Sequence, residues 1–389
     1  MINWQTYELG EVISNVIDNR GRNPPSYKDV GVPVIDNFMI KDKKSIDLSE
    51  TRRFIDNKTF NTFIRQYIQP KDVLITLVGG IGNVSQAPKE KSVIIQNTIG
   101  LRSNGKIDTD FLFYYLKLNK GKILTLNRGV AQPSVKVSDL KLLKINLPSL
   151  PVQQKISKIL SNYDDLIENN LKRIKLLKES ARHTYEEWFL RFRIDGKKLK
   201  VERDSRLPLG WELVKIGSLL QRIKNTIKIK SSEILESGKY PVIDQGADFI
   251  SGYTNETNIN EFTDTPFIVF GDHTRILKFV DFSFVRGADG TQILISNNIR
   301  MPQTLFYHSL KALDLSNYHY ARHFKFLKEE KIILPTETIS TAFDSKCIII
   351  FKQIKNLRSQ NKLLKDARNI LLPRLMTGII DTKKMVIAT

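Results

Sequence analysis

The chain has 389 residues, of which 41% are hydrophobic and 26% charged, proportions typical of a folded protein with sizeable cores. Its net charge of +20 favours a polyanionic partner such as nucleic acid, with an acidic protein, an anionic lipid or a merely lysine-rich composition as alternatives. No apolar run reaches the length of a membrane span, and a single cysteine excludes an internal disulfide and a thiolate metal cluster, so we expect a cytoplasmic protein without membrane contact.

Residues 1–149 predict a mixed α/β domain. Hydrophobic runs at 73–78 and 92–96 predict strands, and the apolar segment 110–120 predicts a buried helix. Clusters of glycine, asparagine and proline mark the turns between such elements, at 21–25, 79–82 and 104–105.

Residues 150–196 predict a long central helix with the seam of a coiled coil. Its seam positions alternate at spacings of four and three residues: Ile156, Leu160, Tyr163, Ile167, Asn170, Ile174, Leu177 and Ala181. Pro151 stands at the start of the helix, where its missing N–H costs nothing. A single stripe of this kind is also typical of an ordinary amphipathic packing face.

Residues 197–335 predict a linker followed by a second domain in the style of the first. The segment 195–210 is charged and contains turn residues, as linkers do. Strands are predicted at 267–270 and 292–295, and a helix at 305–314. Residues 336–382 then predict a C-terminal helix with a second seam: Phe343, Cys347, Ile350, Ile354, Leu357, Asn361, Leu364 and Arg368.

The chain is an internal repeat. The segment WQTYELGEVI at 4–13 returns as WELVKIGSLL at 211–220, shifted by 207, whereas Leu147-Pro148 returns at 334–335, shifted by 187. The second copy has therefore lost about twenty residues in its middle. Because neither seam can be buried alone, we expect the two helices to pack on each other. The two helix seams are also related by the shift of 187. Each helix has about forty residues, which gives it a length of roughly 60 Å.

Chain direction makes that packing antiparallel. The predicted fold is thus α+β, with two mixed α/β domains separated by two long antiparallel helices in a pseudo-two-fold repeat, and with one domain at each end. Asn170 and Asn361 are candidates for fixing the helix register. We expect helix pairing through eleven of the seam residues: Ile156, Leu160, Tyr163, Ile167, Ile174, Leu177, Phe343, Ile350, Ile354, Leu357 and Leu364.

No fragment makes a positive case for catalysis. Asn23-Pro-Pro-Ser26 resembles the loop of amino-methyltransferases, but Ser26 stands where an aromatic residue is needed and no glycine-rich cofactor loop follows. His319 and His323 have the spacing of a helical zinc pair, yet Tyr320 stands where the catalytic glutamate of such enzymes belongs. We expect no metal, cofactor or catalytic residue on this chain.

Several loops instead combine cations with amides, serine and glycine. Lysine and arginine pair with phosphate or guanine, and glutamine and asparagine read adenine, although solvated surface loops have a similar composition. The predicted DNA-binding residues of the first copy are Arg20, Arg22, Gly80, Asn83, Gln96, Asn97, Arg128, Gln132 and Ser134. Those of the second copy are Arg222, Lys224, Lys228, Lys230, His273, Arg275, Arg286 and Gln292.

Across nearly its whole length the chain resembles the specificity subunits of type I restriction–modification systems. The resemblance rests on segments in duplicate order: RGVAQPSVKVSDLKLLKINLP (128–148), LPSLPVQQKISKILSNYDDLIENNLKRIKLL (147–177), TYEEWF (184–189), LPLGWE (207–212), GDHTR (271–275) and RGADG (286–290). The second helix departs from the pattern, because Glu337 and Phe343 replace a polar, glutamine-rich start.

The resemblance implies a non-catalytic subunit whose two target-recognition domains each read one half of a bipartite double-stranded DNA sequence. It implies that the helices dock two modification subunits, which carry S-adenosylmethionine and methylate adenine. Restriction subunits that use ATP and magnesium would join the complex. A coiled-coil adaptor that binds an acidic protein and no DNA is the main alternative, and a stand-alone methyltransferase is another.

Overall fold

The first and last strands of each copy pair in the same register. In the computed structural model, which describes residues 4–129, 133–223, 226–257, 259, 261–263, 266–288, 290–315 and 322–382, β1 (Gln5–Glu8) runs antiparallel to β9 (Lys144–Leu147). β12 (Glu212–Lys215) runs antiparallel to β19 (Lys331–Leu334) in the same way. Gln5 lies opposite Leu147 and Glu212 opposite Leu334, so the pairs are related by the shifts of 207 and 187. The predicted repeat is confirmed.

The first copy contains two further sheets. One has the order β2-β8-β5-β6 and the other the order β4-β3-β7, with β3 parallel to β7. The strands are β2 (Ile13–Ile17), β3 (Val32–Ile35), β4 (Phe54–Ile55), β5 (Val73–Thr76), β6 (Val84–Gln86), β7 (Val93–Ile94) and β8 (Thr98–Ser103). The helices are α1 (Asn57–Thr62), α2 (Thr109–Leu118), α3 (Lys120–Leu124) and α4 (Val137–Lys141).

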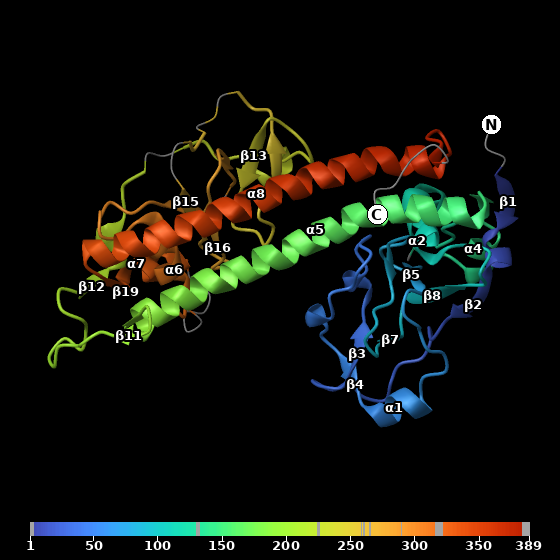
Figure 1. Cartoon of the computed structure of the whole chain (residues 1–389), viewed down its shortest axis with the longest axis horizontal. Coiled ribbons are helices and arrows are strands. Elements are labelled where there is room, and N and C mark those ends of the chain that lie inside the picture. The colour runs from blue at the N-terminus through green and yellow to red at the C-terminus, as the bar shows by residue number, and fades with distance from the viewer. Residues whose placement is uncertain are drawn as a thin grey trace. The chain divides into compact units, whose positions relative to one another are not determined.

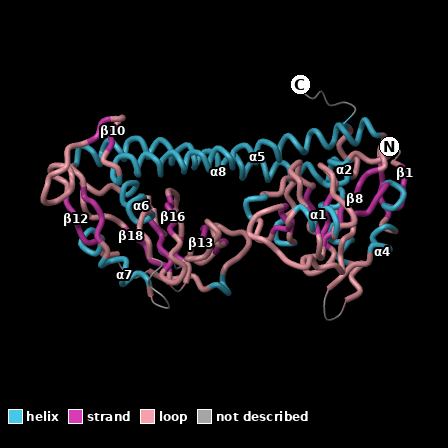
Figure 2. The backbone as a smooth tube through the Cα atoms, turned by 90° about the horizontal axis from the view of Figure 1, so that it is seen from below, coloured by secondary structure: helices cyan, strands magenta, loops and turns pink. Residues whose placement is uncertain are grey.

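The second copy repeats this arrangement with fewer residues. Its sheets have the orders β16-β15-β18 and β14-β13-β17, and β13 is parallel to β17. The strands are β13 (Tyr240–Ile243), β14 (Gly252–Thr254), β15 (Phe267–Gly271), β16 (Leu277–Val280), β17 (Val285–Arg286) and β18 (Thr291–Leu294). The helices are α6 (Gln303–Lys311) and α7 (His323–Glu329). Short strands joined by long loops dominate both copies (Figure 2).

The equivalent strands show where the second copy is shorter. The parallel pairs match Val34 with Val242, a shift of 208. The next strands match Thr76 with Gly271, a shift of only 195. Most of the missing residues therefore lie between these strands, where the first copy has α1.

Two long helices, α5 (Leu150–Tyr185) and α8 (Glu337–Met376), each belong to both compact units of the chain (Figure 1). Unit 1 comprises Met1–Asn170 with Gln360–Thr389, and unit 2 comprises Leu171–Ser359. The two compact units thus divide inside the helices, whereas the sequence predicted each helix as a segment of its own. The predicted segment boundaries stay a prediction.

The helices pair antiparallel within each unit, as predicted. In unit 1, Asp164 of α5 pairs with Arg368 of α8, and six residues later Asn170 meets Asn361, seven residues earlier in α8. In unit 2, Ile174 packs against Ile354 and Leu357. The eleven seam residues expected to pair the helices are all buried or half-buried.

Both helices are shorter than the segments 150–196 and 336–382 in which they were predicted. After α5, a π-helical turn (Glu186–Leu190) inserts Trp188 and Phe189 into the core of unit 2, and the chain then forms the hairpin of β10 (Arg193–Ile194) and β11 (Lys197–Lys198). α8 ends before Gly378, whose φ of +74° suits a residue that terminates a helix.

Part of the predicted linker at 195–210 is packed rather than free. Leu207 is buried in the core of unit 2. Packing also explains why the second helix lacks the polar, glutamine-rich start of the first. Phe343 is fully buried, and its ring lies 5.1 Å from that of Phe189. The equivalent residue of the first helix, Ile156, is buried in the core of unit 1.

Candidate nucleic-acid interface

The predicted loops of the first copy meet on one surface, here called loop cluster 1 (residues 20–23, 78–83, 96–97, 127–129, 133 and 134). The Gln96 side chain donates a hydrogen bond to Asn23. The Leu77 N–H donates to the Asn97 carbonyl at 2.8 Å, and the next residue, Val78, is bridged to Ser134. Segments far apart in sequence are thereby held side by side.

Arg20 and Arg22 lie at the edge of loop cluster 1, and each is held by a neighbour. Arg20 forms a bidentate ion pair with Asp18, with a shortest distance of 2.7 Å. Partial burial acts to raise the pKa of Asp18, but hydrogen bonds from Arg20 and its charge outweigh burial and hold that pKa below its usual value. Arg22 lies over the Phe63 ring at 5.4 Å. Both guanidinium groups are half-buried and so pre-positioned.

A glycine turn forms the centre of loop cluster 1. Gly79 and Gly82 have φ near +80°, which L-side chains rarely adopt, so the turn needs glycine. A Cβ on Gly82 would also lie 3.0 Å from Lys120. Gly80 is exposed, and Asn83 accepts a hydrogen bond from Lys120. The turn thus presents backbone to solvent at a fixed position.

Arg128 is the most exposed predicted cation of this cluster whose contacts are described. Its side chain is 65% exposed and pairs with Asp139 at 2.8 Å. Its backbone N–H donates to the Ser134 carbonyl at 3.1 Å, which ties it to the cluster. Gln132 lies outside the described residues.

The loops of the second copy converge on Gln245 and form loop cluster 2 (residues 228–230, 244–246, 271–275, 286–288 and 290–292). The His273 N–H donates to the Gln245 side-chain oxygen at 3.1 Å, and the Thr274 hydroxyl donates to its backbone carbonyl at 2.7 Å. A Cβ on Gly290 would lie 2.8 Å from the Gln245 amide. Glycine is therefore required for this close approach.

The predicted arginines of loop cluster 2 are partly engaged by the protein. Arg286 donates to the Thr291 carbonyl at 2.8 Å, and burial lowers its pKa. Arg275 donates to the Leu315 carbonyl at 3.0 Å although it is exposed. Gln292 is half-buried on β18. The two arginines therefore use part of their bonding capacity to support the loop conformations.

Not all predicted cations of the second copy belong to the cluster. The Ile229 N–H donates to the Arg286 carbonyl at 2.9 Å, so exposed Lys228 and Lys230 belong to the cluster. Arg222 instead follows Gln221, which is bonded to Ile295 beyond the far end of β18. Lys224 lies outside the described residues.

Two amides that organise the clusters, Asn37 and Gln245, are not among the predicted residues. Asn37 donates to the Val78 carbonyl at 2.8 Å and accepts from the Thr98 hydroxyl at 2.6 Å, and Gln245 has the equivalent place in the second copy. The signal was present, because PVID at 33–36 precedes Asn37 and the same four residues at 241–244 precede Gln245. Aligning the two copies on this repeat, at a shift of 208, identifies both amides.

The structure also bears on the histidine pair, the cysteine and the membrane spans considered from the sequence. His319 lies outside the described residues, and among the described residues no group of three or more His, Cys, Asp or Glu is arranged to hold a metal. Cys347 is buried, and burial raises the pKa of its thiol to about 12. In the described chain, no helix is both long and apolar enough to cross a membrane.

The sequence profile of the type I restriction modification DNA specificity domain matches residues 1–179 and 208–368. The chain belongs to this family. Each matched range contains one copy of the repeat, with its globular segment and most of one long helix. The family's domain is therefore present twice, and each copy contributes one of the two loop clusters.

Relatives and solved structures agree with this membership. The chain is 26% identical to the specificity subunit of type I restriction enzyme MjaIX from Methanocaldococcus jannaschii, over 87% of this chain and 84% of the relative. It is 28% identical to a putative type I specificity subunit from Mycoplasma genitalium, over 65% and 63% of the two chains. The crystal structure of a type I restriction–modification S subunit from M. genitalium covers 96% of both chains, at 18% identity and a TM-score of 0.58, and so shares the fold.

Proposed function

We propose that this chain is the DNA sequence-recognition subunit of a type I restriction–modification complex and has no catalysis of its own. The observation that carries the proposal is the duplication of the loop clusters. In both copies one strand of the parallel pair is followed, two residues later, by an amide, Asn37 or Gln245. Glycine, amide and cationic loops gather around this amide. One such cluster per domain is what reading a bipartite target requires.

The two clusters place different DNA-contacting side chains on equivalent strands and loops. The glycine turn of loop cluster 1 has its counterpart in a loop with His273 and Arg275 in loop cluster 2. Cations such as Arg22 and Lys228 contact phosphate and provide affinity, whereas amides contact base edges and provide specificity. The two half-sites therefore differ in sequence, and equivalent faces of B-DNA about 34 Å apart accommodate both.

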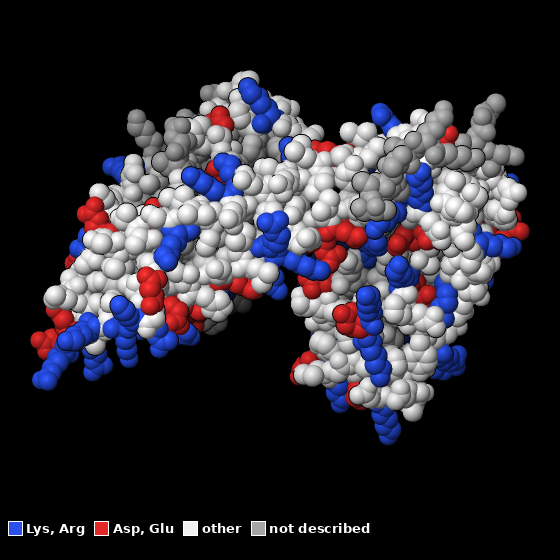
Figure 3. All heavy atoms as spheres, in the orientation of Figure 1, with Lys and Arg blue, Asp and Glu red and all other residues white. Residues whose placement is uncertain are grey.

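The net charge does not gather in a single patch on the face seen in Figure 3, where lysines and arginines are interspersed with acidic side chains. Affinity then comes from cations distributed around the reading loops and falls steeply with salt concentration as counterions are released.

The long helices dock two modification subunits. Leu176 of α5 and Leu363 of α8 are related by the shift of 187, and they are 63% and 69% exposed. Large apolar side chains exposed at equivalent positions fit two equivalent partner surfaces. S-adenosylmethionine belongs to those modification subunits, and ATP and magnesium belong to the restriction subunits; this chain holds none of them.

A coiled-coil adaptor that binds only an acidic protein is not favoured, because it would need neither family membership nor duplicated loop clusters. Binding of duplex DNA by the complex of this chain with its modification subunits tests the proposal. Methylated adenines mapped across the source genome should form a bipartite motif that disappears when the gene is deleted. A complex that binds acidic protein but no duplex, or a genome with an unchanged motif after deletion, would refute it.

A further inference from the structure

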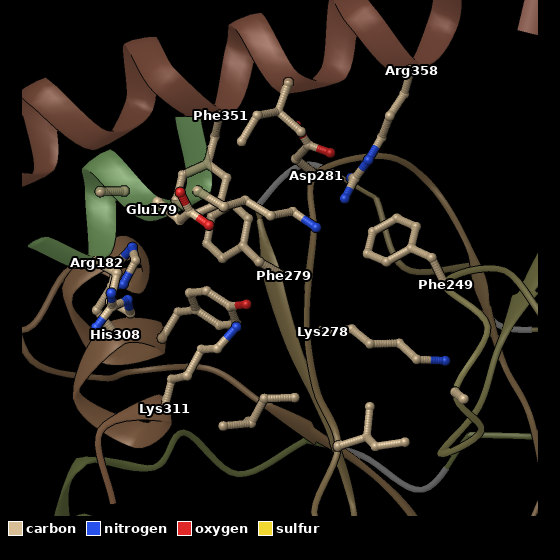
Figure 4. Close-up of a pocket in the computed structure, with 17 residues that line it drawn as sticks. Glu179, Arg182, Phe249, Lys278, Phe279, Asp281, His308, Lys311, Phe351 and Arg358 are labelled. Atoms are coloured by element: carbon tan, nitrogen blue, oxygen red, sulfur yellow. The ribbon is translucent and has the colours of Figure 1, made fainter. Parts of the chain in front are cut away.

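Unit 2 contains a partly enclosed cavity whose lining lies outside loop cluster 2. It has a volume of about 390 Å³ and lies between α5, α8, β16 and α6 (Figure 4). Binding sites for small ligands have roughly 300–1,000 Å³, so a phosphate, a pyrophosphate or a mononucleotide is of suitable size. Ala247 and Ile276, which line the cavity, adjoin loop cluster 2 in sequence.

The lining of the cavity is strongly cationic. Five lysines and arginines line it against two carboxylates: Lys178, Arg182, Lys278, Lys311 and Arg358 against Glu179 and Asp281. Of these five, Arg182 pairs with Glu186 and Lys278 with Asp244 at 3.7 Å. Among the described residues, no carboxylate oxygen lies within ion-pair distance of Lys178, Lys311 or Arg358.

Of the three unpaired cations, Lys178 lies close enough to Arg358 and Lys311 for their charges to repel its own. Partial desolvation, together with the positive charges of Arg358 and Lys311, lowers the pKa of Lys178. Burial lowers the pKa of Arg358, whose guanidinium lies 3.9 Å from the centre of the Phe249 ring. Figure 4 shows Arg358 extending from α8 towards Asp281 and Phe249. An anion between these groups would relieve the repulsion.

The equivalent interface of unit 1 is neutralised by its own carboxylates. There Asp164 accepts from the Tyr114 hydroxyl at 2.6 Å and pairs with Arg368, and Asp165 lies 3.9 Å from Lys44. The shift of 187 places Phe351, Lys352 and Lys355 of α8 at the positions of Asp164, Asp165 and Glu168. The second copy has therefore replaced three acids by one aromatic residue and two cations.

A buried polar atom at the cavity also lacks a partner. His308 lines the cavity at 5% exposure, and its Nε2 has no hydrogen-bond partner among the described residues. It occupies the helix position of Tyr114, whose hydroxyl in unit 1 bonds Asp164. In unit 2 both that carboxylate and its hydrogen bond are missing, so the Nε2 of His308 is left without a partner beside the cations.

We propose that this cavity binds a phosphate group, carried either by a small anion or by the DNA backbone next to loop cluster 2. Arginine and lysine are the side chains that bind phosphate oxygens, and Arg358 is pre-positioned by its stacking on Phe249. The site depends on neither base reading nor helix docking, so it goes beyond the proposed function.

Calorimetric titration of the full chain with pyrophosphate, and separately with adenosine monophosphate, tests the proposal at constant ionic strength in chloride. We expect saturable binding at one site by at least one of them. Arg358→Gln should weaken that binding about tenfold or more, because one charge-assisted contact is lost. The matched control is Lys352→Gln, an exposed cation on the same helix outside the cavity, which should bind as the unaltered chain does.

Lys178→Glu gives a readout that does not depend on loss of folding. It places a carboxylate among the cations, so the free protein should melt at a higher temperature and pyrophosphate should no longer raise that temperature. A duplex that competes with pyrophosphate identifies DNA as the source of the phosphate, and independent binding identifies a small anion. No saturable binding of either probe, or equal affinities of Arg358→Gln and Lys352→Gln, would overturn the proposal.

Discussion

Asn170 and Asn361 meet across the helix pair of unit 1, where the Asn170 side-chain amide donates a hydrogen bond to the Asn361 side-chain oxygen at 2.9 Å. The two residues are only 7% and 5% exposed. A buried asparagine pair within an apolar seam lowers stability but penalises every register in which the amides do not meet. The pair therefore fixes the alignment of α5 with α8.

Replacing one member of this pair should destabilise the chain, and replacing both should restore stability. Asn170→Leu leaves the Asn361 amide buried without that partner, at a cost of about 1–3 kcal/mol in the free energy of unfolding. The double change to leucine removes both polar groups, so its urea midpoint should equal or exceed that of the unaltered chain. A double variant no more stable than the single one would contradict a direct coupling of the two side chains.

Protonation of His308 should destabilise unit 2 in mildly acidic solution. Burial, aided by the charge of Lys311, lowers the His308 pKa from 6.5 to about 4; Lys178 and Arg182 of α5 line the same cavity. The unfolded chain therefore takes up a proton between pH 6.5 and 4 that the folded chain does not. The free energy of unfolding should fall by roughly 1.4 kcal/mol per pH unit in that window, about 3 kcal/mol in all, and change no further from this group below pH 4.

Unfolding midpoints measured from pH 7.5 to 4 check this dependence. His308→Gln should flatten the profile relative to the unaltered chain, whereas His183→Gln, at an exposed position, should leave it unchanged. Parallel profiles for all three proteins would show that His308 titrates as freely in the folded chain as in the unfolded one.

The sequence predicted the helix pair better than the loop clusters, for a physical reason. The seam from Ile156 to Ala181 repeats at helical spacing, so a local pattern states which side chains are buried. The loops carry no such period. Composition identified Arg286 as a cation in a glycine loop, but not that its guanidinium binds the Thr291 carbonyl, because that contact depends on how β17 and β18 are placed.

Asn37 shows the same limit of loop composition, for a residue that composition did not select. It is neither cationic nor next to glycine, so loop composition did not predict a role for it. In the structure it nevertheless joins the Val78 carbonyl to the Thr98 hydroxyl. The two partners lie 41 and 61 residues from Asn37 in sequence. Such a role follows only from the fold, or from comparing the two copies strand by strand.

Arg20 and its partner Asp18 should affect DNA affinity in opposite directions. Arg20→Ala removes a positive charge from the edge of loop cluster 1, so binding should weaken for every sequence, and the slope of log K against log salt should fall by about 1. Asp18→Asn removes the negative charge that holds Arg20 and should strengthen binding. Fluorescence anisotropy of a labelled duplex from 50 to 200 mM salt measures both. Lys106→Ala, an exposed cation outside the cluster, is the control; equal slopes in all variants would make Arg20 an ordinary surface residue.

The exposed leucines of the helices should govern assembly without affecting the fold. Leu176→Ser and Leu363→Ser each remove apolar area from one proposed docking surface, so each should weaken capture of modification subunits about tenfold, and the double variant should capture neither. Light scattering of the mixed subunits gives the stoichiometry. Leu209→Ser is the matched control, because Leu209 is 78% exposed but lies outside the helices. An undiminished complex in the double variant would place docking elsewhere.

Asn37→Ala and Gln245→Ala should each alter the reading of one half-site only. Loss of the Asn37 side chain frees the Val78 carbonyl and the Thr98 hydroxyl and loosens the turn that contains Gly80, at a cost of about 1–3 kcal/mol in stability. Gln245→Ala removes the acceptor of the His273 N–H in the other copy. Adenine methylation mapped in cells that carry each variant should show one half of the bipartite motif relaxed and the other retained, with the halves exchanged between the two variants. Relaxation of the same half in both, or of neither, would separate these amides from sequence reading.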